Sequence, residues 1–177
     1  MTAATTILPS LAGRRARRTR RITALFTGTA VLTFAVTGIG LFEGHVVYPS
    51  WYDLAAYDGF ADYHAAFGRR LIPWLPVPLL AATVLNGLML RWRPPAVPRA
   101  VVLTTFVLQI GIGAVTAALA LPLQAQLGTA GNSPAEVVDL LDQLVRISWL
   151  RDVPGVAIAL AFVWMLHRQL SERRSGA

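Results

Sequence analysis

Two histidines and three charged residues carry side chains that suit proton transfer to and from a hydrophobic molecule. His45 and His64 lie between the first two apolar segments of the chain. Arg146, Arg151 and Asp152 lie where the last apolar segment begins. A histidine can remove a proton from a weakly acidic C–H or O–H group, and an arginine can stabilise the anion that forms. The sequence therefore predicts one of the histidines as the base and one of the arginines as the stabilising cation.

Arg151 and Asp152 are also unusual for their position, because they lie where an apolar helix would enter a membrane. A charged side chain at this depth is costly unless it is paired or faces a cavity. The sequence predicts an ion pair near one membrane face, and Asp152 joins the candidate catalytic residues.

Aromatic side chains accompany the histidines. One face of a predicted helix carries three aromatic residues and a histidine at helical spacing, namely Tyr57, Phe60, His64 and Phe67. Two interpretations stay open, because such a stripe can pack against a helix bundle or can hold His64 beside a substrate. Flat ring systems stack on aromatic side chains. The candidate residues for that stacking are Tyr48, Trp51, Tyr57, Phe60 and Trp149.

Asn86 and Gln109 are polar side chains inside apolar segments. The default role of such a residue is a hydrogen bond to a neighbouring helix. Contact with a polar group of a substrate is the other role, and both residues belong to the predicted substrate-binding set.

A metal site is the alternative chemistry for the histidines. His45, His64 and one carboxylate from Glu43, Asp58 or Asp62 would form a site with two histidines and one carboxylate. No close spacing of these residues supports that site. An electron-rich carbanion reacts with dioxygen directly, so the prediction includes neither a metal nor another cofactor.

The composition excludes several classes of protein. The 177 residues include 16 arginines and no lysine, nine acidic residues and no cysteine, and 55% of them are hydrophobic while 14% are charged. A nucleic-acid-binding domain with a net charge of +7 would carry more charge and less apolar bulk. Without cysteine the chain has no disulfides, no zinc–thiolate or iron–sulfur site and no dithiol redox chemistry.

Long apolar segments indicate a membrane protein. Residues 22–42, 71–90 and 100–123 carry no charged side chain. About 20 apolar residues cross a bilayer as a helix. A fourth segment, 153–166, is shorter and reaches spanning length only when it begins near residue 147. The sequence predicts an all-α, integral-membrane four-helix bundle, with spans at about 22–42, 71–91, 100–122 and 148–167.

The arginines indicate the orientation. Six precede the first span, three lie between the second and third spans, and three follow the fourth, whereas every acidic residue except Glu172 lies on the other side. By the positive-inside rule, both termini are cytoplasmic and the protein lies in the cell (inner) membrane. Residues 1–21 are expected to form a disordered basic tail, 22–170 the membrane domain, and 171–177 a second cytoplasmic tail.

The segments outside the membrane differ in content. On the extracytoplasmic side we expect short amphipathic helices, one of which begins at Ser133, Pro134 and Glu136 as a capping box. At the N-terminus, residues 19–21 faintly match a twin-arginine export signal. Because the apolar run is long and three more spans follow, we expect an uncleaved anchor instead.

Several short motifs resemble the DUF1772 family, which includes the anthrone oxygenase-like proteins. The resemblance covers roughly residues 22–170 and is carried by residues 48–51, 63–67 and 144–151 with Pro73, Pro78 and Asn86. Ser148 stands where the family commonly has asparagine. The resemblance implies a small four-span membrane protein in natural product biosynthesis, which oxidises anthrones derived from polyketides to anthraquinones without a cofactor.

The predicted function is therefore base-assisted, cofactor-independent oxidation or rearrangement of a hydrophobic aromatic molecule that reaches the site from the lipid bilayer. Nucleic acid is not expected as a partner, and homo-oligomerisation stays open. The alternative is a non-enzymatic membrane protein, either an accessory or a transport-related subunit. An enzyme of the predicted kind would have a pocket that joins His64 to Arg146 or Arg151.

Overall fold

The computed structural model describes residues 4–175, with side chains from residue 13 to residue 172, and these residues form helices and turns only. The first continuous rod consists of four segments: α1 (Ala4–Phe42), the π-helical η1 (Glu43–Val47), α2 (Tyr48–Trp51) and the 3₁₀ segment η2 (Tyr52–Leu54). It is followed by α3 (Phe60–Leu71) and α4 (Pro76–Met89). The second half comprises α5 (Arg99–Val115), the π-helical η3 (Thr116–Ala120), α6 (Leu121–Leu127) and the long α7 (Pro134–Ser175).

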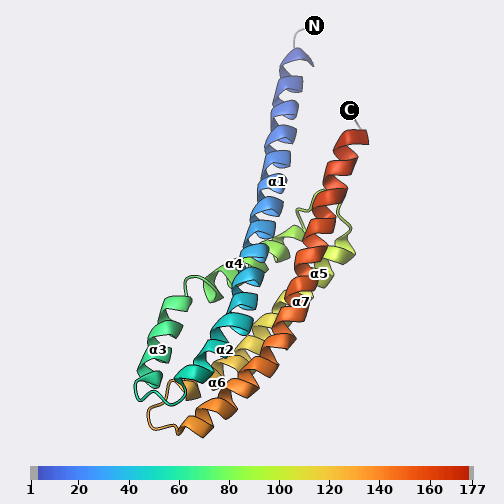
Figure 1. The fold of residues 1–177 in the computed structure, drawn as a ribbon. Coiled ribbons are helices and arrows are strands. Elements are labelled where there is room, and N and C mark those ends of the chain that lie inside the picture. The colour runs from blue at the N-terminus through green and yellow to red at the C-terminus, as the bar shows by residue number, and fades with distance from the viewer. Residues whose placement is uncertain (1–3, 176–177) are drawn as a thin grey trace.

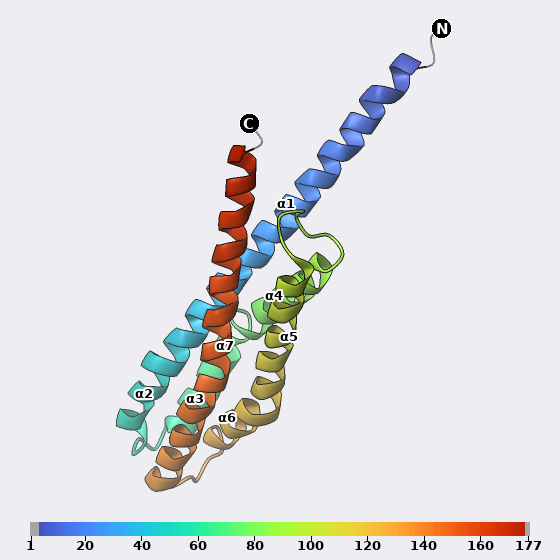
Figure 2. The ribbon, with the colours of Figure 1, turned by 90° about the vertical axis from the view of Figure 1, so that its right-hand side faces the viewer.

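The helices form four candidate membrane spans, as the sequence predicts. The segments Gly13–Leu54, Phe60–Met89, Arg99–Leu127 and Pro134–Glu172 are long and apolar enough to cross a bilayer. α1 packs against α4 and α7, and α5 packs against the same two helices. Both termini lie at one end of the bundle, and the connections after η2 and α6 lie at the other end (Figures 1 and 2).

Two hydrophobic clusters hold the bundle together. The cluster nearer the termini contains Phe26, Met89, Val102, Phe162 and Met165, all of them almost fully buried. The second cluster, at the opposite end, centres on Tyr48, Trp51, Leu127, Leu141 and Leu144. Many large apolar side chains instead face outward along the spans, which is typical of helices surrounded by lipid.

The second candidate span, Phe60–Met89, is interrupted by turns. The helix breaks after Leu71, residues 72–75 form turns, and α4 begins at Pro76. Pro73, Pro76 and Pro78 explain the break, because a proline lacks a backbone N–H and keeps the residue before it out of helical geometry. The structure therefore divides this segment into α3 and α4.

The helices extend into both predicted tails. α1 begins at Ala4, within the segment 1–21 that is expected to form a disordered basic tail, and that disorder stays a prediction. Alanine, leucine and arginine, which are strong helix formers, are frequent there and let the first span continue beyond the bundle. α7 likewise continues through the predicted tail as far as Ser175. Residues 1–3 and 176–177 lie outside the described part of the chain.

Two of the four spans contain a π-helical segment, η1 or η3, that contacts α7. α7 itself contains Pro154, which leaves the carbonyl of Leu150 without its helical donor. Single π-turns inside α-helices occur frequently at functional sites, so this region is where we look for one.

The predicted start of the last helix is confirmed. Ser133 Oγ accepts a hydrogen bond from the Glu136 backbone N–H at 3.3 Å, and the Glu136 carboxylate accepts one from the Ser133 backbone N–H at 2.7 Å. This reciprocal pair is a capping box, and it sets where α7 begins.

Candidate functional site

A cavity of about 340 Å³ lies inside the bundle, between α1, α4, α5–η3 and α7. Its wall is mostly apolar, and the polar exceptions include Arg151 and Asp152 from α7 and Gln109 from α5. A concave apolar pocket with a few converging polar groups is the usual form of a small-molecule site. The volume is at the lower end of the range for such sites, which is about 300–1,000 Å³.

The cavity reaches the outer surface of the bundle between α4 and α5. Leu80 from α4, Ile110 from α5 and Leu121 from α6 line it. Each of these side chains is at least half exposed. These helices are candidate membrane spans, so the opening lies on the side surface of the bundle rather than at one of its ends.

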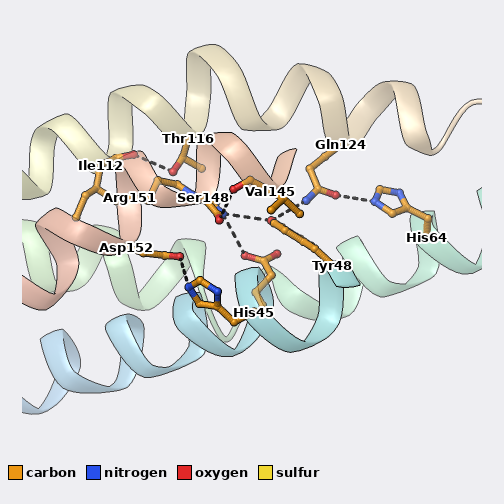
Figure 3. A network of polar contacts seen from close by, with 11 residues as sticks. His45, Tyr48, His64, Ile112, Thr116, Gln124, Val145, Ser148, Arg151 and Asp152 are labelled. Atoms are coloured by element: carbon orange, nitrogen blue, oxygen red, sulfur yellow. Dashed lines mark hydrogen bonds and ion pairs between the residues drawn. The ribbon is translucent and has the colours of Figure 1, made fainter. Parts of the chain in front are cut away.

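Four ionisable side chains gather at one end of the cavity. His45 Nε2 lies 3.2 Å from Asp152 Oδ2, and Arg151 Nη2 lies 3.9 Å from Glu43 Oε2 (Figure 3). The Asp152 and Glu43 side chains are each only 5% exposed, and that of Arg151 is 10% exposed, whereas His45 is 41% exposed. Arg151 and Asp152 therefore each have a different partner, Glu43 and His45 respectively, instead of forming the predicted pair with each other.

Two buried polar atoms at this charged end make no hydrogen bond in the described part of the chain. Arg151 Nε and Asp152 Oδ2 are buried, and neither makes a hydrogen bond within the described residues, although Asp152 Oδ2 keeps its ion-pair contact with His45. Buried polar atoms are normally bonded, and each exception needs an explanation. Both residues line the cavity, and Asp152 Oδ2 is on the side of His45 and Gly44.

A chain of hydrogen bonds connects His64 to Arg151. His64 Nε2 lies 2.6 Å from Gln124 Oε1, Gln124 Nε2 donates to the Tyr48 hydroxyl at 3.0 Å, and Arg151 Nη2 donates to the same hydroxyl at 3.3 Å (Figure 3). His64 therefore reaches Arg151 through two side chains. The pocket that the sequence analysis expects between them is not the observed cavity, because His64 does not line it.

His64 is instead part of an aromatic cluster. Its ring lies edge-on to Trp51, with centroids 4.8 Å apart, and tilted against Phe60 at 5.9 Å. Phe67 also packs edge-on against Trp51, at 5.2 Å. The predicted stripe is thus confirmed for Phe60, His64 and Phe67, and it packs inward. Tyr57 is 61% exposed and precedes α3, so it does not belong to the stripe.

Other predicted site residues lie away from the cavity. Arg146 and Trp149 are exposed on α7, and Trp149 contacts the edge of His45, with ring centroids 5.0 Å apart. Tyr57 and Phe60 line a separate, smaller cavity of about 230 Å³ between the two long extramembrane connections. Trp51 and Tyr48 are fully buried and act as packing residues.

Asn86 and Gln109 lie together, as part of a buried polar cluster. Asn86 Nδ2 donates to Gln109 Oε1 at 2.8 Å and to Thr105 Oγ1 at 3.1 Å, and Gln109 Nε2 donates to Thr33 Oγ1 at 3.4 Å. The cluster links α1, α4 and α5, which is the expected interhelical role. Gln109 and Thr33 also line the cavity, whereas Asn86 does not.

The residues of the alternative metal site do not come together in the described part of the chain. Within the described residues, no group of three or more histidine, aspartate or glutamate side chains is arranged to hold a metal ion. His64 lies among aromatic rings beside Gln124, while His45 pairs with Asp152. The two histidines therefore face different partners, and no shared carboxylate joins them.

Sequence reasoning missed three residues of this region. Glu43 was considered only as a metal ligand, although it lies beside Arg151. Gln124 and Thr33 were not singled out at all, because single polar residues near the end of a span or inside it are common. A helical wheel of the first span places Thr33, Thr37 and Gly40 on one face, at steps of four and three residues, and this signal could have indicated the cavity wall.

Comparison with protein-family models, with curated proteins and with solved structures finds no match for this chain. The resemblance to the anthrone oxygenase-like family therefore stays a prediction. What is shown is an all-helical bundle with four candidate membrane spans, and inside it an apolar cavity with a charged end.

Proposed function

We propose that this protein is a membrane-embedded enzyme that binds a hydrophobic aromatic molecule in the bundle cavity and removes a proton from it. The observation that carries the proposal is the charged end of an otherwise apolar cavity, where Arg151 and Asp152 line the wall and Arg151 Nε is buried without a hydrogen bond among the described residues. A buried cation beside a carboxylate suits a substrate with an acidic group. The resemblance to the anthrone oxygenase-like family agrees with such a substrate.

Asp152 is the base in this proposal, rather than His64. The Asp152 carboxylate lines the cavity and takes a proton from an acidic C–H group of an anthrone-type ring. His45, in contact with Asp152 and half exposed, can then accept the proton and release it outside the bundle. Arg151 stabilises the negative charge that develops on the ring oxygen, because a fixed cation has a strong effect in a site without water.

Dioxygen is the co-reactant. The carbanion gives its electron pair to form a carbon–oxygen bond, and with a returned proton the product is a hydroperoxide. Loss of water then leaves a carbonyl, so that a CH₂ group and O₂ become C=O and H₂O. The carbon is oxidised, dioxygen is reduced, and both substrates dissolve in the lipid from which the cavity opens.

Four residues position these groups without touching the substrate. Glu43 and Tyr48 hold the Arg151 guanidinium from the side of η1 and α2. Gln124 and His64 in turn fix the Tyr48 hydroxyl. We therefore assign His64 a positioning role, at the far end of a chain that ends on the cation.

The proposal includes an orientation. The termini lie at one end of the bundle, and the arginine-rich segments belong to this end. By the positive-inside rule it is cytoplasmic, so that His45 releases its proton near the extracytoplasmic face of the cell membrane.

The test uses the full chain in lipid nanodiscs with dihydroxyanthrone as the probe. Dioxygen uptake and the absorbance of the anthraquinone are followed against empty nanodiscs, because anthrones also oxidise slowly without protein. We expect Asp152→Asn to lower the rate above background by about 100-fold or more, since a positioned base contributes at least that factor.

Asp139→Asn is the matched control, because Asp139 is an exposed carboxylate on the same helix, away from the cavity. It should leave the rate unchanged. A wild-type rate equal to that of empty nanodiscs would contradict the proposed enzyme. In that case binding of the probe without turnover would favour the alternative, an accessory or transport-related membrane protein.

A further inference from the structure

The cavity has polar side chains away from its charged end, and most of them are already satisfied. Five such residues line it: Thr33, Thr37, Thr83, Gln109 and Thr116. Three of the threonine hydroxyls donate to backbone carbonyls: Thr37 to Gly155, Thr83 to Leu79 and Thr116 to Ile112. A threonine has a single hydroxyl hydrogen. Those three side chains are therefore not available as donors to a ligand.

Gln109 differs from these threonines. It is 3% exposed, its Oε1 accepts from Asn86, and one of its two amide N–H groups donates to Thr33. A primary amide carries two N–H donors. The second donor is left for a molecule in the cavity, and the bonds to Asn86 and Thr33 hold the amide in place. Thr33 Oγ1 accepts the hydrogen bond from Gln109, and it donates none to another described residue.

The helices also give a distance along the cavity. Along α5, η3 and α6 its wall runs from Gln109 to Leu121, and along α7 it runs from Ile158 to Arg151. Gln109 and Thr116 are seven residues apart, as are Ile158 and Arg151, which corresponds to about 10 Å at 1.5 Å per residue. α5 and α7 are neighbours that run in opposite directions. Gln109 therefore lies at the level of Ile158, and Arg151 lies about 10 Å further along the cavity, at the level of Thr116.

We propose that Gln109 determines substrate specificity, by donating a hydrogen bond to a carbonyl oxygen at the far end of a flat aromatic substrate whose acidic group lies at Arg151 and Asp152. The inference rests on the proposed function and narrows its substrate class. The substrate is elongated, with an ionisable group at one end and an acceptor oxygen about 10 Å away. A ring system without that oxygen leaves a buried amide N–H unpaired, which costs affinity.

The test measures binding of two probes that dioxygen does not oxidise. One is a biphenyl with a para hydroxyl on one ring and a para acetyl on the other; the second carries an isopropenyl group of the same shape in place of the acetyl. Dissociation constants are measured by calorimetry with the wild-type protein in nanodiscs. We expect the acetyl probe to bind about tenfold more tightly, the effect of one hydrogen bond in a dry site.

Gln109→Leu should abolish the preference for the acetyl probe while the isopropenyl probe still binds. Thr83→Val is the matched control, because Thr83 lines the same cavity but its hydroxyl is bonded to Leu79, and it should retain the preference. Equal binding of the two probes to the wild type, or a preference that survives in Gln109→Leu, would overturn the inference.

A second measurement avoids the variant, in case Gln109→Leu does not fold. The infrared stretch of an isotope-labelled acetyl carbonyl falls when the oxygen accepts a hydrogen bond. We expect a lower frequency in the wild-type protein than in alkane, and an unchanged frequency would refute the inference. Neither measurement depends on turnover, so an inactive protein with the probe preference would contradict only the proposed function.

Discussion

Gly44 lies on the side of η1 that faces α7, and replacing it tests whether the close packing of the two sets the geometry of the charged end. A Cβ atom on Gly44 would lie 3.0 Å from Asp152 Oδ2 and 3.2 Å from both Cβ and Oγ of Ser148. Favourable contacts between such atoms begin at about 3.5 Å. Gly44→Ala must therefore move η1 and α7 apart by a few tenths of an ångström, and with them His45 and Asp152.

Gly38→Ala is the control for the size of the change in the free energy of unfolding. Gly38 lies on α1, and a Cβ atom there would meet nothing within 4 Å. Alanine in place of a helical glycine gains up to about 1 kcal/mol from helix propensity, and both variants receive this gain. Only Gly44→Ala also pays for overpacking, which costs about 1–3 kcal/mol. The free energies of unfolding of the two variants should therefore differ by about 1–3 kcal/mol.

The assay is reversible unfolding of the full chain in mixed micelles, followed by circular dichroism, together with dihydroxyanthrone turnover. We expect Gly44→Ala to be the less stable variant and to lose turnover, while Gly38→Ala keeps it. In a Ser148→Gly background two of the three close contacts disappear, so the penalty of Gly44→Ala should shrink. Equal stabilities of Gly44→Ala and Gly38→Ala would refute the reasoning.

Three further predictions concern the opening, the cation and the start of α7. Leu80→Trp should block the opening between α4 and α5 and weaken binding of the biphenyl probes at least tenfold. Val84→Trp changes an exposed position on the same helix away from the cavity and should leave the affinity unchanged. Equal affinities of the two variants would place the opening elsewhere. Arg151→Met should lower the free energy of unfolding by about 3–5 kcal/mol, because it leaves the buried Glu43 carboxylate without its cation; a loss below about 1 kcal/mol would contradict the proposed dependence of Glu43 on Arg151. Ser133→Ala should cost about 0.5–2 kcal/mol through loss of the helix cap, with turnover unchanged, and an unaltered unfolding curve would show that the cap is dispensable.

The membrane architecture follows from local sequence properties. Three features act only on neighbouring residues and can therefore be recognised from the sequence. They are the apolar runs without charge, the prolines of residues 73–78 and the capping box at Ser133. The same holds for the inward stripe of Phe60, His64 and Phe67, because its spacing alone places it on one helical face. The extent of the helices beyond the membrane was less readable, since arginine suits a helix and a solvated tail equally well.

The site depends on contacts between distant parts of the chain. The sequence by itself indicated that Arg151 and Asp152 need partners, because unpaired charge is costly at a membrane face. It could not indicate that Asp152 pairs with His45, that Arg151 pairs with Glu43, or that His64 is withdrawn from the cavity and bonded to Gln124. Those pairings follow from the rotation and depth of one helix against another.

Residue types, apolar lengths and charge bias thus determined a four-span helical protein with ionisable groups near one face. Only the tertiary structure decided which of these groups surround a common space. Packing of α1, α4, α5 and α7 leaves a cavity that is lined by Gln109 and by the pair Arg151 and Asp152. The physical reason is that hydrophobicity acts along each helix, whereas a cavity arises from how side chains of several helices fit together.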